Sequence, residues 1–173
     1  MDELSRLGKK YGTDKTGKHH YLPVYYNLFK DRRSEIKKVL EIGVGEGASL
    51  RMWREFFSSA MIYGGEIQHD RIFKEERIEV LSCDQSFEVD LADLIAYTGS
   101  DIDLFVDDGS HLSQDQLFTC LTVMPWLDKK VIYVIEDVAD ASLAGHIREY
   151  DVETVDCGKR YDDRLLIIRH KHG

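Results

Sequence analysis

The stretch VLEIGVGEGASL (Val39–Leu50) decides the fold, because an apolar run leads into three closely spaced glycines and a helix is expected to begin near Ala48. The glycines are Gly43, Gly45 and Gly47. Without a Cβ they allow a tight turn in which the backbone approaches a ligand closely. The segment is therefore interpreted as a strand, a turn and a helix, the first unit of an α/β fold.

Further apolar runs and helical segments extend this pattern along the chain. Seven strands are expected, at 38–44, 61–67, 78–83, 102–106, 131–135, 152–155 and 165–168. Helical spacing occurs at 49–57, more weakly at 70–77, and at 87–97, 113–126 and 139–150. The alternation predicts a Rossmann-like, seven-stranded, mostly parallel sheet with helices on both faces.

A chain of 173 residues with 43% hydrophobic content is long enough for one substantial core and too short for two ordinary domains. We expect a single domain, with an N-terminal helical cap over 1–35 and a Rossmann-like core over 36–173. The cap contains two expected helices, 2–10 and 22–31, which would cover one edge of the sheet or the ligand crevice.

The net charge argues against some binding partners, and the cysteine spacing argues against disulfide bonds and a zinc site. A net charge of -9 makes nucleic acid a poor candidate, because a phosphate backbone would be repelled. Cys83, Cys120 and Cys157 are far apart and suggest neither a disulfide framework nor a zinc site. With no apolar leader or membrane-spanning run in the sequence, a cytoplasmic protein that contacts no membrane is expected. The oligomeric state, including a homo-oligomer, stays open.

Glu66 follows the second expected strand, about 20 residues after the glycine turn, where a carboxylate can bind both hydroxyls of a ribose. The turn and Glu66 together indicate an adenosine-type cofactor. Glu41 precedes the glycines and completes E-x-G-x-G-x-G, which resembles the first motif of class I methyltransferases. Two alternatives stay open: the glycines serve the turn alone, or the G-x-G-x-x-A pattern belongs to a nicotinamide oxidoreductase.

Acidic pairs end two further strands, in VDDGSH (Val106–His111) and VIED (Val134–Asp137). If these strands are neighbours, about 4.8 Å apart, their carboxylates converge and repel one another. A hard divalent cation, Mg²⁺ or Mn²⁺, would relieve that repulsion. The alternative is that the aspartates cap the following helices. His111 lies three residues after Asp108 and can face the same crevice, where an imidazole suits a general base.

Several motifs together resemble the Mg²⁺-dependent sugar O-methyltransferases of macrolide biosynthesis and the related rhamnosyl O-methyltransferases, a group whose members are often named cephalosporin hydroxylases. They are KYGTDK (10–15), HHYLPVY (19–25), LEIGVGEGASLRMW (40–53), IYGGEI (62–67), CDQS (83–86), VDDGSH and VIED. The chain departs from the group in Glu66, where members often have Asp, and in its short length, which leaves little room for the segments that shape an acceptor pocket.

The resemblance implies a role for each matching position. Asp108, Glu136 and Asp137 match metal ligands, and His111 matches a catalytic base that acts beside Asp108. The positions expected near S-adenosylmethionine are Thr13, Lys15, Tyr21, Glu41, Gly43, Gly45, Gly47, Ser49, Glu66, Asp84, Gln85 and Asp107. Of these, Thr13, Lys15 and Tyr21 are expected to close over the cofactor.

The expected activity is therefore the S-adenosylmethionine- and Mg²⁺-dependent methylation of a hydroxyl on a sugar or glycan acceptor of the rhamnose type. The metal would bind two neighbouring hydroxyls while His111 removes a proton from one of them. Because any vicinal diol suits that chemistry, a catechol acceptor is the first alternative. A catalytically silent domain that binds S-adenosylmethionine is the second.

Overall fold

A single sheet organises the computed structural model, which describes residues 1–158 and 160–171. Its eight strands lie in the order β3-β4-β2-β1-β5-β6-β8-β7. Their bounds are β1 Lys38–Ile42, β2 Met61–Glu66, β3 Lys74–Glu75, β4 Ile78–Ser82, β5 Leu104–Asp107, β6 Ile132–Ile135, β7 Asp151–Asp156 and β8 Arg164–Arg169. The α/β class and the mostly parallel sheet are confirmed, with one strand more than expected.

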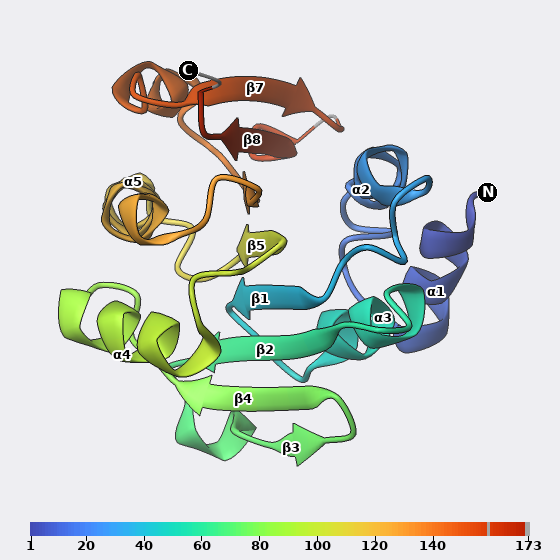
Figure 1. Cartoon of the computed structure of the whole chain (residues 1–173). Coiled ribbons are helices and arrows are strands. Elements are labelled where there is room, and N and C mark those ends of the chain that lie inside the picture. The colour runs from blue at the N-terminus through green and yellow to red at the C-terminus, as the bar shows by residue number, and fades with distance from the viewer. Residues whose placement is uncertain (159, 172–173) are drawn as a thin grey trace.

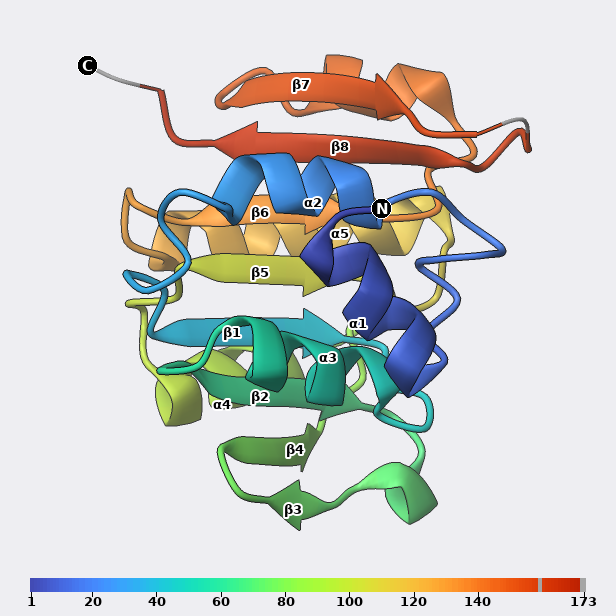
Figure 2. The ribbon, with the colours of Figure 1, turned by 90° about the vertical axis from the view of Figure 1, so that its right-hand side faces the viewer.

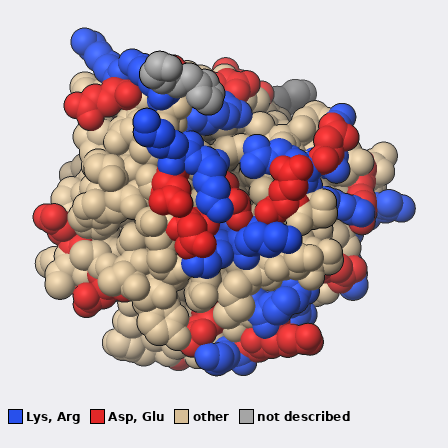
Figure 3. Space-filling model, in the orientation of Figure 1, with Lys and Arg blue, Asp and Glu red and all other residues tan. Residues whose placement is uncertain are grey.

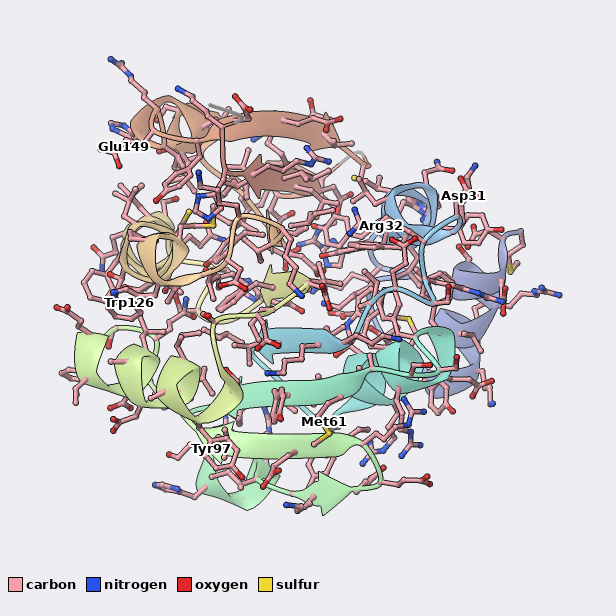
Figure 4. The ribbon with its side chains drawn as sticks, in the orientation of Figure 1. Asp31, Arg32, Met61, Tyr97, Trp126 and Glu149 are labelled. Carbon is pink, nitrogen blue, oxygen red and sulfur yellow. The ribbon has the colours of Figure 1, made fainter. Side chains whose placement is uncertain are left out.

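Helices cover both faces of the sheet (Figures 1 and 2). One face carries α1, α2 and α3, and the other carries α4 and α5, so Asp31 and Trp126 point to opposite sides in Figure 4. The helices are α1 Glu3–Tyr11, α2 Leu22–Phe29, α3 Ala48–Phe56, α4 Glu88–Thr98 and α5 Ser113–Val123, and the 3₁₀ turns are η1 His69–Arg71, η2 Met124–Trp126 and η3 Ala141–His146. The apolar faces of these helices are buried against the sheet from both sides.

A separate apolar core fills each space between helices and sheet. On the α1–α3 side the fully buried Trp53 contacts Tyr25, with ring centroids 5.1 Å apart. On the α4–α5 side Phe105 stacks on Tyr133 at 4.6 Å. Burial of these large rings, together with the aliphatic residues around them, holds the layers together.

The predictions of two helices, over 70–77 and 139–150, are wrong. The stretch 70–77 contains η1 and then β3, which pairs antiparallel with β4 through a turn at Arg77 (φ 58). That left-handed backbone reverses the chain where a helix would have continued. The stretch 139–150 contains η3, whose preceding Asp140 accepts a hydrogen bond from Ser142 N at 2.8 Å. This cap fixes the start of η3, and the turn ends at Ile147, whose backbone (φ -106, ψ 43) is not helical.

The N-terminal helices lie against a face of the sheet, on the same side as α3 (Figure 2). Helix α1 begins where Asp2 accepts a hydrogen bond from Ser5 N and ends at Gly12, which has φ 75. The connection from Gly12 to Tyr21 then brings Thr13 and Asp14 to the wall of a pocket. The segment 1–35 thus contributes to the site.

The strand order places that pocket. From β1 the chain moves outward to β2 and β4 and then returns to β5 on the other side of β1, with all of these neighbours parallel. The reversal leaves a crevice at the carboxyl ends of β1 and β5. Among the described residues, none of the helices has the length and apolar character needed to cross a bilayer. On the face drawn in Figure 3, acidic and basic side chains are interspersed.

Candidate active site

The glycine turn after β1 has the conformation its sequence predicts. Gly43, Gly45 and Gly47 have φ of 86, 55 and 77, in the left-handed region that favours glycine. A Cβ at Gly43 would lie 2.0 Å from the carbonyl oxygen of Asp108. Glycine at this position therefore allows the turn to touch the end of β5, and the two strand ends share one wall of the pocket.

Glu66 ends β2 with its carboxylate turned toward the glycine turn. Its Oε2 accepts hydrogen bonds from Val44 N at 3.0 Å and Gly45 N at 3.1 Å, and its Oε1 accepts one from Gln68 N at 3.0 Å. A carboxylate oxygen has two lone pairs, so Oε2 uses both of its own and Oε1 keeps one for a further donor. Glu66 is therefore a fixed anion in the pocket wall that can accept hydrogen bonds from a ribose.

The pocket at these strand ends has a volume of about 640 Å³, in the range of cofactor sites. Nine of the residues predicted from the sequence line it: Thr13, Gly43, Gly45, Ser49, Glu66, Asp84, Gln85, Asp108 and His111. Its wall also contains residues that the sequence did not single out, among them Gln68, Arg71, Ser110 and Asp115. Gln68 and Ser110 could have been anticipated, because they lie two and three residues after strand ends that were already of interest.

Other predicted cofactor residues lie behind that wall. Glu41 is fully buried, and its carboxylate accepts hydrogen bonds from Ser49 Oγ at 2.5 Å and Trp53 Nε1 at 2.6 Å. Tyr21 donates to Asp137, and Gly47 is packed against the ring of Phe73. These residues support the turn and the acidic groups, and they contribute no surface to the pocket.

Asp107 is also behind the wall, on the α4–α5 side of the sheet. It accepts hydrogen bonds from Gln85 Nε2 at 3.1 Å and from Tyr133 OH at 3.2 Å. Burial raises the pKa of Asp107 to about 7, although these two hydrogen bonds act in the opposite direction. The Oε1 of Gln85 accepts from Ser110 N at 2.7 Å, so Gln85 ties Asp107 to the loop that carries His111.

Strands β5 and β6 are parallel neighbours, with Asp107 opposite Ile135, as the convergence of the two acidic pairs requires. The structure brings ligand atoms of Asp108, His111 and Asp137 within 4.8 Å of one another. His111 Nδ1 lies 3.9 Å from Asp108 Oδ1 and 3.7 Å from Asp137 Oδ2. His111 and Asp137 have φ of 57 and 52, a strained conformation for residues other than glycine. Oxygen ligands at this spacing suit a hard divalent cation.

Glu136 lies beside that group in a different environment. Its Oε2 accepts a hydrogen bond from Lys15 Nζ at 2.7 Å, and its Oε1 accepts one from Tyr25 OH at 2.6 Å. Burial raises the pKa of Glu136, the negative charges of Asp108 and Glu41 raise it further, and Lys15 opposes the rise. Tyr25 belongs to the HHYLPVY motif, but its contact with β6 had no signal in the sequence.

Lys15 lies among the acidic residues and does not line the pocket. Its ammonium donates to Asp108 Oδ2 at 2.6 Å and lies 3.5 Å from Glu41 Oε1. Burial alone would lower the pKa of Lys15, but Asp108, Glu136 and Glu41 together raise it well above its usual value. The side chain is thus a buried cation with three carboxylate neighbours.

Comparisons with known proteins agree with this geometry. No family model matches the chain. The 8-demethyl-8-alpha-L-rhamnosyl tetracenomycin-C 2'-O-methyltransferase of Streptomyces olivaceus is 34% identical over 158 residues, 87% of this chain and 42% of that protein. The mycinamicin VI 2''-O-methyltransferase of Micromonospora griseorubida is 36% identical over 83% of this chain and 38% of its own length. The chain thus spans about two fifths of the curated relatives it matches.

Solved structures show the same relationship. The MycE methyltransferase from the mycinamycin biosynthetic pathway, in complex with Mg, SAH and mycinamycin VI, superposes with a TM-score of 0.79 at 26% identity, over 98% of this chain and 55% of that one. A caffeoyl-CoA O-methyltransferase homologue from Staphylococcus aureus shares the fold, with a TM-score of 0.67 at 12% identity. The chain has the Rossmann-like fold of the class I S-adenosylmethionine-dependent methyltransferases and is similar to these sugar O-methyltransferases.

Proposed function

We propose that this protein transfers a methyl group from S-adenosylmethionine to a hydroxyl oxygen of a rhamnose-type sugar or glycoside, with a divalent metal ion, Mg²⁺ or Mn²⁺. The observation that carries the proposal is the continuity of two sites. Asp108 and His111 line the same pocket as Glu66 and the glycine turn. An acceptor hydroxyl held beside Asp108 and His111 would therefore face a cofactor held by Glu66 and the glycine turn.

In this proposal the residues of the cofactor pocket hold S-adenosylmethionine in place and take no part in the chemical step. The carboxylate of Glu66, fixed by Val44 N and Gly45 N, accepts hydrogen bonds from the ribose hydroxyls. The glycine turn leaves room for the amino acid end of the cofactor, and Asp84 and Gln85 border the other side of the pocket. Glu41 acts indirectly, because it fixes Ser49, which lines the pocket.

Asp108, Asp137 and Glu136 are the proposed metal ligands. Asp108 and Asp137 meet within 4.8 Å of His111, and Lys15 bridges the carboxylates of Asp108 and Glu136. When bound, a divalent cation would hold two neighbouring hydroxyls and make one of them more acidic. His111 then accepts that proton as the oxygen approaches the methyl group in line. His111 has an exposed side chain, as a base that must meet an incoming acceptor requires.

The experiment is a methyl-transfer screen over rhamnosides and catechols, with Mg²⁺ or with EDTA, in which mass spectrometry detects the methylated product. The expected result is a methylated sugar that forms with Mg²⁺ and not with EDTA. Asp108→Asn should abolish this activity, while Asp93→Asn, a change at an exposed residue of α4, should leave it intact. Turnover on catechols alone would contradict the sugar acceptor, and turnover unaffected by EDTA would contradict the metal.

A further inference from the structure

Lys15 occupies an unusual place for a lysine. Its side chain is 1% exposed, and its ammonium lies within 3.5 Å of carboxylate oxygens from three different strand ends, those of Glu41, Asp108 and Glu136. A buried ammonium is costly unless it is paired and hydrogen-bonded, and here the pairing is complete. Two of its partners are proposed metal ligands, so the ammonium is a permanent neighbour of the metal site.

We propose that Lys15 positions Asp108 and Glu136 for a divalent metal ion and, by its charge, limits how tightly that ion binds. The inference rests on the proposed function for the assignment of those two carboxylates to the metal. It goes beyond that function by giving Lys15 the role of a positioning residue that makes no contact with the cofactor.

Hydrogen bonds from one segment of the chain support all three proposed metal ligands. The residues from Lys15 to Tyr25 supply at least one donor to each proposed ligand: Lys15 to Asp108 and Glu136, Tyr21 to Asp137 at 2.5 Å, and Tyr25 to Glu136. Hydrogen bonds of this kind hold metal-binding side chains in one orientation before the ion arrives. One segment of the chain therefore orients all three proposed ligands, Asp108, Glu136 and Asp137.

The positive charge of Lys15 also changes the electrostatics of the site. Without Lys15, buried carboxylates from neighbouring strands would repel one another, and the metal-free protein would be destabilised. With Lys15 present, the site has less net negative charge for an incoming cation to neutralise. The ammonium and the metal thus serve the same electrostatic purpose, and each reduces the stabilisation that the other provides.

The two effects of removing Lys15 differ in size. Loss of an orienting hydrogen bond weakens metal binding by about 10- to 100-fold. Loss of a positive charge a few ångströms from the ion strengthens it by more, because the repulsion between a divalent and a monovalent cation at such a distance corresponds to several powers of ten at an effective dielectric constant of about 20. Lys15→Met should therefore bind the metal more tightly than the native protein, by about tenfold or more.

The experiment compares the native protein, Lys15→Met, Lys15→Arg and Tyr25→Phe. Metal affinity is measured by calorimetric titration with Mn²⁺, and thermal unfolding is recorded with EDTA and with Mg²⁺. Lys15→Met should melt lower than the native protein in EDTA and gain more from Mg²⁺, whereas Lys15→Arg, which keeps the charge, should bind Mn²⁺ as the native protein does. Lys18→Met is the matched control, because Lys18 is in the same connection and half exposed.

Tyr25→Phe removes only a hydroxyl and leaves the ring against Trp53, so it tests orientation without a change of charge. It should bind Mn²⁺ about 10- to 100-fold more weakly. A Lys15→Met protein that folds only with the metal supports the inference. If Lys15→Met folds under neither condition, Lys15→Gln, which keeps a polar donor and removes the charge, decides: tighter Mn²⁺ binding than in the native protein supports the inference, and equal binding overturns it.

Equal metal affinity and equal Mg²⁺ stabilisation in the native protein and Lys15→Met would overturn the role of Lys15 and leave the proposed function intact. A native protein that binds no divalent metal would overturn both.

Discussion

A Cβ on Gly43 would lie only 2.0 Å from the carbonyl oxygen of Asp108. This close approach joins the glycine turn of the cofactor pocket to Asp108, one of the three proposed metal ligands. Because the obstacle is backbone, a side chain at residue 43 can be accommodated only if one of the two strand ends moves.

Gly43→Ala should therefore damage folding and both parts of the site. It combines a clash with a φ of 86, and we expect a loss of about 2–4 kcal/mol in the free energy of unfolding. Urea unfolding measures this loss. Gly145→Ala is the control, because nothing lies within 4 Å of a Cβ there, and its stability should stay close to native. A Gly43→Ala protein of native stability would contradict the close approach.

Glu66→Gln should weaken the binding of S-adenosylhomocysteine by about tenfold or more, because a neutral amide replaces a charged acceptor of the ribose hydrogen bonds. The fold should survive, since the amide oxygen can still accept from Val44 N and Gly45 N and only the hydrogen bond from Gln68 N is lost. Calorimetric titration measures the affinity. Glu76→Gln changes an exposed residue in the turn between β3 and β4 and should bind like the native protein. Native affinity in Glu66→Gln would remove Glu66 from the cofactor site.

Asp107 predicts a pH dependence of stability. Its pKa in the folded protein is raised to about 7, above the value in an unfolded chain, so its contribution is fully present below about pH 4 and is lost as the pH rises through about 7. Asp107→Asn keeps the size of the side chain and cannot ionise. The stability of the variant relative to the native protein should therefore rise between about pH 4 and 7, by at most about 1.4 kcal/mol per pH unit. Urea unfolding across this range measures it, and a constant difference would contradict the raised pKa.

His111→Ala should lower turnover by about 10² to 10⁴, because a positioned general base contributes that much. The variant should keep the affinity for S-adenosylhomocysteine and the increase in melting temperature with Mg²⁺, since the base is assigned no part in either. His69→Ala, at an exposed residue of η1, is the control for activity. Near-native turnover would remove His111 as the base, and loss of the Mg²⁺ stabilisation would place it among the metal ligands instead.

The sequence predicted the parts of the fold and site that depend on local pattern. The glycine turn, Glu66 at the end of β2 and the two acidic pairs were found from strand ends, and strand ends are predicted from apolar runs bounded by turns. The expected helices over 70–77 and 139–150 were wrong, because the helical spacing was overridden by a left-handed Arg77 in one case and by the non-helical backbone of Ile147 in the other.

Contacts between distant segments could not be predicted in this way. The burial of Lys15 depends on three carboxylates supplied from β1, β5 and β6, and nothing in KYGTDK signals them. The same holds for Tyr25, which lies 111 residues from its partner Glu136. Asp107 and Asp108 are adjacent, yet they face opposite sides of the sheet, because successive strand side chains alternate.

The most direct test of the account is a calorimetric titration of the metal-stripped protein with S-adenosylmethionine, followed by addition of Mg²⁺ and a rhamnoside. The account predicts saturable binding of the cofactor to the native protein, weaker binding to Glu66→Gln, and methylation of the sugar only after Mg²⁺ is added. No binding of S-adenosylmethionine to the folded protein would contradict it.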